Sequence, residues 1–197
     1  GETWLKEEGK LDIETGLSVG IEIAKGLQVA HEHHIYHLDL KPANLLLKKT
    51  NSGLISVKII DFGLARVATS LRDNVHSATG KTQFGQMIIG TLYYAPPEQL
   101  GHTEYGEPSA RSDLYAFSGT LYRLMTGEIP QPLNPIFLTE APPALFQLLC
   151  QCLNREPAQR PDSAEEVVKQ LAEIKAGLKN GRTRSVQAGI PLPRVGT

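Results

Sequence analysis

The segment from Asp113 to Thr126 constrains the fold most, because it reads as a helix without a polar face. Large apolar residues recur on nearly every side of it: Leu114, Tyr115, Phe117, Leu121, Leu124 and Met125. Such a helix needs protein around it on all sides, whereas a surface helix keeps a polar stripe. Gly127 follows and predicts its C-terminal end. We therefore expect a mainly α-helical domain built around this central helix.

Three further helices are predicted, at about residues 12–33, 144–153 and 163–178. The first carries apolar residues at steps of three and four, as on the buried face of an amphipathic helix: Ile13, Leu17, Ile21, Ala24 and Leu27. Asp12 fits its N-cap, and Ser163 with Glu166 gives the last helix a capping-box start. Three glycines lower the propensity of the first helix, so we expect packing against its neighbours to hold it.

A single β-hairpin is predicted between the first two helices. Leu45–Lys48 and Val57–Ile60 read as short strands, and the turn residues Asn51, Ser52 and Gly53 lie between them. This pairing puts Asn44 and Asp61 at the open end of the hairpin, one on each strand. Their side chains can therefore approach a single ion.

Composition places the chain among globular proteins. Its 197 residues are 41% hydrophobic and 21% charged, enough for one domain or part of a larger one. The net charge of -1 gives no reason to expect a nucleic acid or an anionic membrane as partner. No apolar run of about twenty residues exists, so we expect no membrane contact from this segment and a cytoplasmic location.

Cysteine usage and the first residue add two smaller expectations. Cys150 and Cys152 lie among leucines without a second pair to complete a zinc site, so we expect buried, reduced thiols. The chain begins with Gly1, and its only methionines are Met87 and Met125. We therefore expect an excerpt of a longer polypeptide.

Four polar residues around the hairpin carry the chemistry. Asp39 supplies a proton acceptor, Lys41 a cation for phosphate, and Asn44 a metal ligand; Asp61, before Phe62 and Gly63, supplies another ligand. Phosphoryl transfer asks a protein mainly for positioning and charge neutralisation, which is what this set provides.

The run His37-Leu38-Asp39-Leu40-Lys41-Pro42-Ala43-Asn44, followed by Asp61-Phe62-Gly63, resembles the catalytic and metal-binding loops of eukaryotic-like (bacterial-type) Ser/Thr protein kinases. The resemblance implies the large C-terminal lobe of that fold at residues 1–178, with a flexible linker at 179–197. It implies that Asp39 accepts the proton of a protein substrate's hydroxyl, that Lys41 contacts the ATP phosphate, and that Asn44 and Asp61 hold Mg²⁺.

The same resemblance assigns supporting roles. Gly90 to Glu98 resembles the end of the activation segment, in which Thr91 would help select Ser/Thr hydroxyls. Glu98 should form a buried ion pair with Arg160, and Asp113 should hold the catalytic-loop backbone. His37 should pack on Phe62. Residues 64–98 lack periodicity and are rich in polar residues, which is typical of a regulatory loop.

Two departures from the family pattern matter. Leu38 stands where most members carry the Arg that pairs with a phosphorylated activation loop, so we expect activity that does not depend on that contact. The sequence also contains no glycine-rich phosphate loop and no strand lysine, so the small β-rich lobe is expected to be absent from this chain and supplied by its parent protein. The isolated chain should then have weak activity or none.

Alternatives remain open at this stage. The chain could be a silent pseudokinase-like binding module, because the lobe that clamps ATP is missing. A small-molecule phosphotransferase of the aminoglycoside or choline kinase type shares part of the loop, but Lys41 and the Pro97-Glu98 pair favour the protein-kinase branch. His31, His33 and His34 suggest zinc, yet Ile35 stands where the helical zinc signature needs His, which favours a helix C-terminus.

Overall fold

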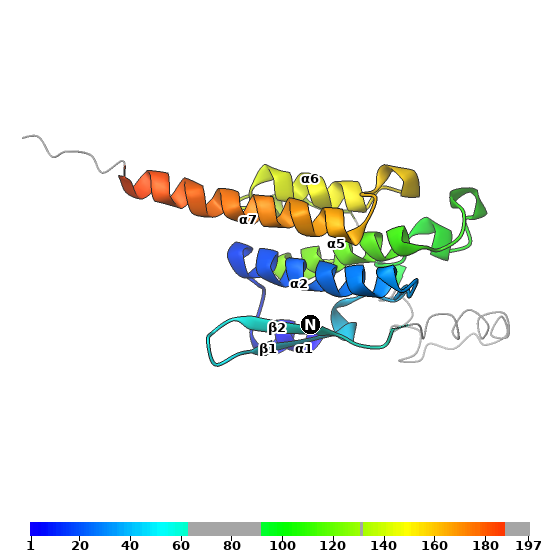
Figure 1. The fold of residues 1–197 in the computed structure, drawn as a ribbon, viewed down its shortest axis with the longest axis horizontal. Helices are drawn as coiled ribbons and strands as arrows, with labels where there is room; N and C mark the ends of the chain where they lie inside the picture. Colours follow the sequence, from blue (N-terminus) through cyan, green and yellow to red (C-terminus); the bar gives the residue numbers. More distant parts are fainter. Residues whose placement is uncertain (63–91, 131, 188–197) are drawn as a thin grey trace, which may run out of the picture.

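The computed structural model describes residues 1–62, 92–130 and 132–187, with side chains to residue 178. Figure 1 shows a layer of long helices lying over a two-stranded hairpin. The helices and strands are α1 (Glu2–Glu7), α2 (Ile13–Glu32), β1 (Leu45–Lys49), β2 (Ile55–Ile59), α5 (Ala110–Thr126), α6 (Pro143–Cys152) and α7 (Ala164–Gln187).

Helix α5 is the centre of the domain, as its apolar sequence predicts. Nearly all of it is buried, and it begins at Ala110, one turn earlier than expected. Ser109 and Ser112 form a capping box at its start, and Gly127 ends it with a φ of 77°. Ser118 inside the helix donates from Oγ to the carbonyl of Leu149 at 2.8 Å, which ties α5 to α6 and satisfies a buried hydroxyl.

Helix α2 packs closely on α5 because two of its glycines leave room. A Cβ atom at Gly16 would lie 2.7 Å from Cγ of Met125, and one at Gly20 would lie 2.8 Å from Cδ2 of Leu121. Asp12 caps the helix by accepting from the amide of Thr15 at 3.0 Å. The glycines that weaken α2 as an isolated helix therefore permit the packing that holds it.

The hairpin has the predicted antiparallel pairing, with Leu45 opposite Ile59 and Lys49 opposite Ile55. Strand β2 begins at Ile55, two residues earlier than predicted. The sheet lies against α2, where Gly26 faces the side chain of Ile59. The amide of Ile60 donates to the carbonyl of Asn44 at 3.0 Å. This bond joins the two strand ends that lie beside the catalytic loop.

Two predictions require correction. Cys150 is exposed, and only Cys152 is buried, because positions two apart on a helix face different sides; burial raises the pKa of the Cys152 thiol to about 12. Helix α7 continues to Gln187, past the end predicted near Leu178, so the segment predicted as a linker starts as helix. The earlier end was predicted because the composition changes to Lys, Gly, Arg and Pro after Gly177.

Among the described residues, no helix is both long and apolar enough to cross a bilayer.

Candidate active site

The backbone of the catalytic loop, residues 37–44, is held by one carboxylate on α5. Asp113 is fully buried and accepts from the backbone amides of His37 at 2.8 Å and Leu38 at 2.7 Å. Carboxylate bonds to backbone N–H groups are charge-assisted and stronger than neutral ones. The role predicted for Asp113, fixing the loop backbone, matches this geometry.

Leu38 has a strained backbone that a second contact fixes. Its φ of 59° lies in the left-handed region, which is unfavourable for a residue with a bulky side chain. Gln99 donates from Nε2 to the carbonyl of Leu38 at 2.7 Å. Asp113 thus holds the amide of Leu38 and Gln99 holds its carbonyl, directly before Asp39. No local pattern predicts the role of Gln99, since its partner Leu38 lies 61 positions away in the chain.

His37 links the loop to the hairpin through Nε2 and bonds within the loop through Nδ1. Nε2 lies 2.9 Å from the carbonyl of Ile60, and the amide of Asp39 donates to Nδ1 at 3.2 Å. These partners require a neutral ring with its proton on Nε2. The ring packs on Phe62 at a centroid distance of 4.7 Å, as expected from the sequence.

Asp39 lies at the open side of the loop, with donors around its carboxylate. Lys41 Nζ lies 2.9 Å from Oδ2 and 3.1 Å from Oδ1. Asn44 Nδ2 donates to Oδ2 at 3.1 Å and to the Asp39 carbonyl at 2.8 Å. The Asp39 side chain remains 28% exposed, so its orientation is fixed while an incoming hydroxyl can reach it.

Asn44 and Asp61 fit a magnesium ion by their chemistry. The Asn44 amide nitrogen is used by Asp39, and no hydrogen bond within the described part of the chain uses its oxygen or the Asp61 carboxylate. Asp61 is exposed and has a φ of 63°, a conformation that Asp tolerates better than most residues. Mg²⁺ prefers hard oxygen ligands and takes few of them from protein.

Two of the histidines at the end of α2, His31 and His33, make protein contacts. His31 Nε2 lies 2.8 Å from Asp113 Oδ2, a bond that sequence reasoning missed, while its buried Nδ1 has no partner within the described residues. His33 Nδ1 lies 2.8 Å from the carbonyl of Val29 near the helix end, as the helix C-terminus interpretation predicts.

A second ion pair lies deep in the domain. Arg160 donates to both carboxylate oxygens of Glu98, at 2.6 and 3.0 Å, and Ser112 donates to the same carboxylate at 2.8 Å. Burial alone would raise the pKa of Glu98, but the bonds from Arg160 and Ser112 outweigh it and hold the pKa below its usual value. The pairing predicted from the sequence is confirmed.

Two predicted site residues, Thr91 and Gly63, lie outside the described residues, as do the hydroxyls of the polar loop between them. The roles assigned to them stay predictions.

Comparison with known proteins identifies the family. The model of the protein kinase domain matches residues 2–171. The chain belongs to the protein kinase family. It is 32% identical to the serine/threonine-protein kinase STY17 of Arabidopsis thaliana, over 84% of this chain and 29% of that protein. It is 31% identical to serine/threonine-protein kinase A of Synechocystis, over 86% of this chain and 35% of that protein. The resemblance to Ser/Thr kinases, bacterial ones included, is thus confirmed.

Solved kinase structures share the fold. Residues 1–466 of Rad53 in complex with AMP-PNP match with a TM-score of 0.62 and 20% identity, over 85% of this chain and 42% of that one. The kinase domain of PknI from Mycobacterium tuberculosis matches with a TM-score of 0.60 and 22% identity, over 84% and 57%. The chain therefore spans about a third of the length of its curated kinase relatives and about half of these structures. Protein kinases in general use ATP and Mg²⁺.

Proposed function

We propose that this chain supplies the catalytic loop, the metal-binding loop and the activation segment of a kinase that transfers the γ-phosphate of ATP to Ser/Thr hydroxyls of protein substrates. The observation that carries the proposal is the Asp39 carboxylate, which is held by Lys41 and Asn44 yet partly exposed. Fixed charges of this kind lower a phosphoryl-transfer barrier because they need no reorganisation during the reaction.

In this mechanism each side chain has one task. Asp39 orients the substrate hydroxyl and accepts its proton, as a positioned general base does. Lys41, bonded to the Asp39 carboxylate, would offer positive charge to the transferred phosphate. Asn44 and Asp61 would hold magnesium through their oxygens; bound Mg-ATP supplies the phosphoryl group and neutralises its charge. Asp113 and Gln99 keep the loop still, which preserves the orientation of Asp39.

Part of the active site is proposed to come from elsewhere in the protein. The sequence holds no glycine-rich loop and no strand lysine of the kind that covers and pairs ATP phosphates. The sheet in the described residues has two strands. We assign adenine binding and the phosphate cover to a small lobe outside this sequence, and Ser/Thr selection to Thr91. Residues 1–178 then act as the large lobe, in the cytoplasm, with protein substrates and no nucleic acid.

The test uses the intact protein, radiolabelled ATP, Mg²⁺ and a generic protein substrate. Asp39→Asn should reduce transfer about 10²–10⁴-fold, because the amide cannot accept the proton. Glu107→Gln is a matched control, since Glu107 is exposed and lies in a loop outside the catalytic loop, residues 37–44. Transfer that survives Asp39→Asn at the wild-type rate would remove Asp39 from its assigned role.

A second candidate, a silent binding module, rests on the missing ATP-covering motifs. It predicts that even the wild-type intact protein transfers no phosphate. Asn44→Leu would then leave nucleotide binding unchanged, whereas the kinase mechanism predicts that it weakens magnesium-dependent binding.

A further inference from the structure

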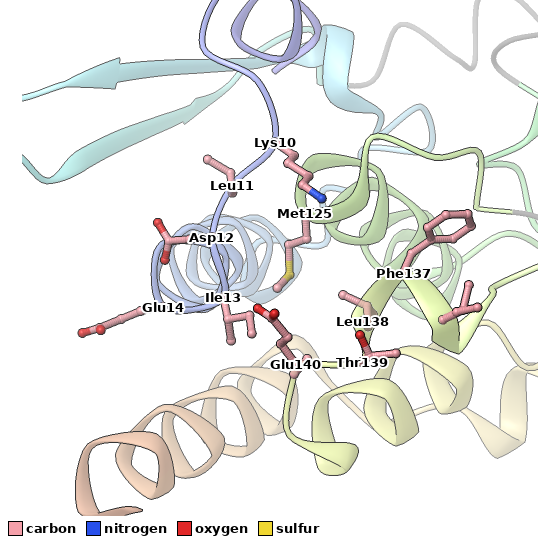
Figure 2. A pocket seen from close by; sticks show the side chains of 12 residues that line it. Lys10, Leu11, Asp12, Ile13, Glu14, Met125, Phe137, Leu138, Thr139 and Glu140 are labelled. Carbon is pink, nitrogen blue, oxygen red and sulfur yellow. The ribbon is translucent and has the colours of Figure 1, made fainter. Parts of the chain in front are cut away.

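A pocket of about 560 Å³ opens at the beginning of α2, where that helix meets the end of α5 and the single-turn helix at Pro135–Leu138. We call it the α2 pocket. Figure 2 shows the thioether of Met125 and the carboxylate of Glu140 pointing toward each other across it. Its volume lies in the range that ligand pockets occupy, about 300–1,000 Å³.

The floor of the α2 pocket is apolar and fixed by the fold. Leu11, Met125 and Leu138 line it and are at most 8% exposed. Gly16 packs directly on Met125, and the Leu11 amide donates to the Leu124 carbonyl at 2.8 Å. Because helix packing and a backbone bond hold these groups, the floor needs little rearrangement to receive an apolar side chain.

The rim combines exposed apolar side chains with excess negative charge. Ile136 is 64% exposed and Phe137 is 45% exposed, beside the floor. The ionisable residues lining the pocket are Lys10, Asp12, Glu14 and Glu140, which sum to a charge of about -2 at neutral pH. Glu140 is exposed and has no partner within the described residues. An acidic rim around an apolar floor selects against anions and favours a cationic partner.

We propose that the α2 pocket docks a short peptide segment of a partner protein, in which a large apolar side chain lies next to Arg or Lys. The apolar side chain would fill the space over Met125, and the cation would pair with the Glu140 side of the rim. Ile136 and Phe137 would cover the rest of the segment, as exposed apolar residues do at interfaces. Fatty acids, anionic phospholipids and nucleic acids carry the same sign of charge as the rim.

The pocket is separate from the catalytic loop. It lies at the beginning of α2 and the end of α5, and none of the loop residues 37–44 lines it. An occupant here leaves Asp39 accessible. If the segment belongs to a protein substrate, which rests on the proposed function, docking raises the local substrate concentration and lowers KM without changing kcat.

The test measures fluorescence anisotropy of labelled peptides with the intact protein, without ATP. The probes share a Gly/Ser background with two arginines beside Leu, Ile, Met or Phe; control peptides replace the arginines by Glu or the apolar residue by Ser. Glu140→Lys should weaken binding about threefold to tenfold, and Ile136→Ser should do likewise. Glu107→Lys and Leu54→Ser are matched controls at exposed positions outside the pocket, and should not change the affinity.

Saturable binding of the basic apolar peptides that both pocket variants weaken supports the proposal. Equal affinity in pocket and control variants, preference for the Glu-containing or Ser-containing peptides, binding of laurate instead, or no peptide binding at millimolar protein would each overturn it. Because this assay involves no transfer, it stands apart from the kinase test. In the kinase assay, appending the best peptide to a substrate should lower KM several-fold in the wild type and leave kcat unchanged.

Discussion

The two ion pairs of this domain differ in what surrounds them. Arg160 and Glu98 have side chains 0% and 1% exposed, and the guanidinium also donates to the carbonyls of Asn154, Arg111 and Arg155. The side chains of Lys41 and Asp39 are 20% and 28% exposed. The first pair is saturated by the protein and stabilises it, whereas the second keeps a carboxylate available for a substrate.

Adjacent residues connect the two pairs. Glu98 and Ser112 belong to the buried ion pair, and the next residue on each segment, Gln99 and Asp113, grips Leu38 beside Asp39. A substitution that breaks the buried ion pair should therefore also disturb the backbone of the catalytic loop. The following changes separate the structural pair from the catalytic one.

Arg160→Ala should have the largest effect on stability. It leaves Glu98 as a lone buried carboxylate, which lowers the free energy of unfolding by roughly 3–5 kcal/mol. Urea or thermal unfolding of the intact protein measures this. Arg155→Ala, an exposed arginine over the ring of Tyr105, is the control and should change stability by less than about 1 kcal/mol. An unaltered melting temperature for Arg160→Ala would contradict the pairing.

Asp113→Asn should have the next largest effect. One amide oxygen replaces two carboxylate oxygens, so one of the buried N–H groups of His37 and Leu38 loses its acceptor, at a cost of about 1–3 kcal/mol. Phosphate transfer should fall further than stability alone explains. If kcat stayed at the wild-type value while unfolding shifted, the carboxylate would have no part in positioning Asp39.

Gln99→Ala should lower the unfolding free energy by about 0.5–1.5 kcal/mol, because the Leu38 carbonyl loses its donor. Gln99→Glu keeps the shape but donates only when protonated. In that variant we expect transfer relative to the wild type to rise as the pH falls. A flat ratio across pH would show that the bond does not position the loop.

The pH dependence of Glu98 should give the smallest effect. Its pKa is lowered in the folded state, so its contribution to stability is complete above the unfolded value of 4.5 and declines as the pH falls through the folded value. The stability difference between wild type and Glu98→Gln, measured by urea unfolding, should shrink below pH 4.5. A stability difference that grows as the pH falls would contradict a lowered pKa of Glu98 in the folded state.

Much of the fold could be predicted because local patterns carry it. The apolar run of α5, the caps Asp12 and Gly127, and the hairpin turn all act within a few residues. The side chains around Asp39 could be predicted only through family resemblance. Gln99 and His31 escaped because their partners, Leu38 and Asp113, lie 61 and 82 positions away, where no periodicity connects them. The predicted end of α7 was wrong because a change of composition after Gly177 does not by itself end a helix.

The most direct test of the catalytic assignment measures phosphate transfer and unfolding free energy together, in the intact wild type and in Asp39→Asn. We predict a loss of transfer of about 10²–10⁴-fold with a stability change within about 0.5 kcal/mol, since the partly exposed Asp39 carboxylate takes part in the chemistry and contributes little to the stability of the fold. Wild-type transfer in the variant, or a loss of transfer that only parallels unfolding, would contradict it.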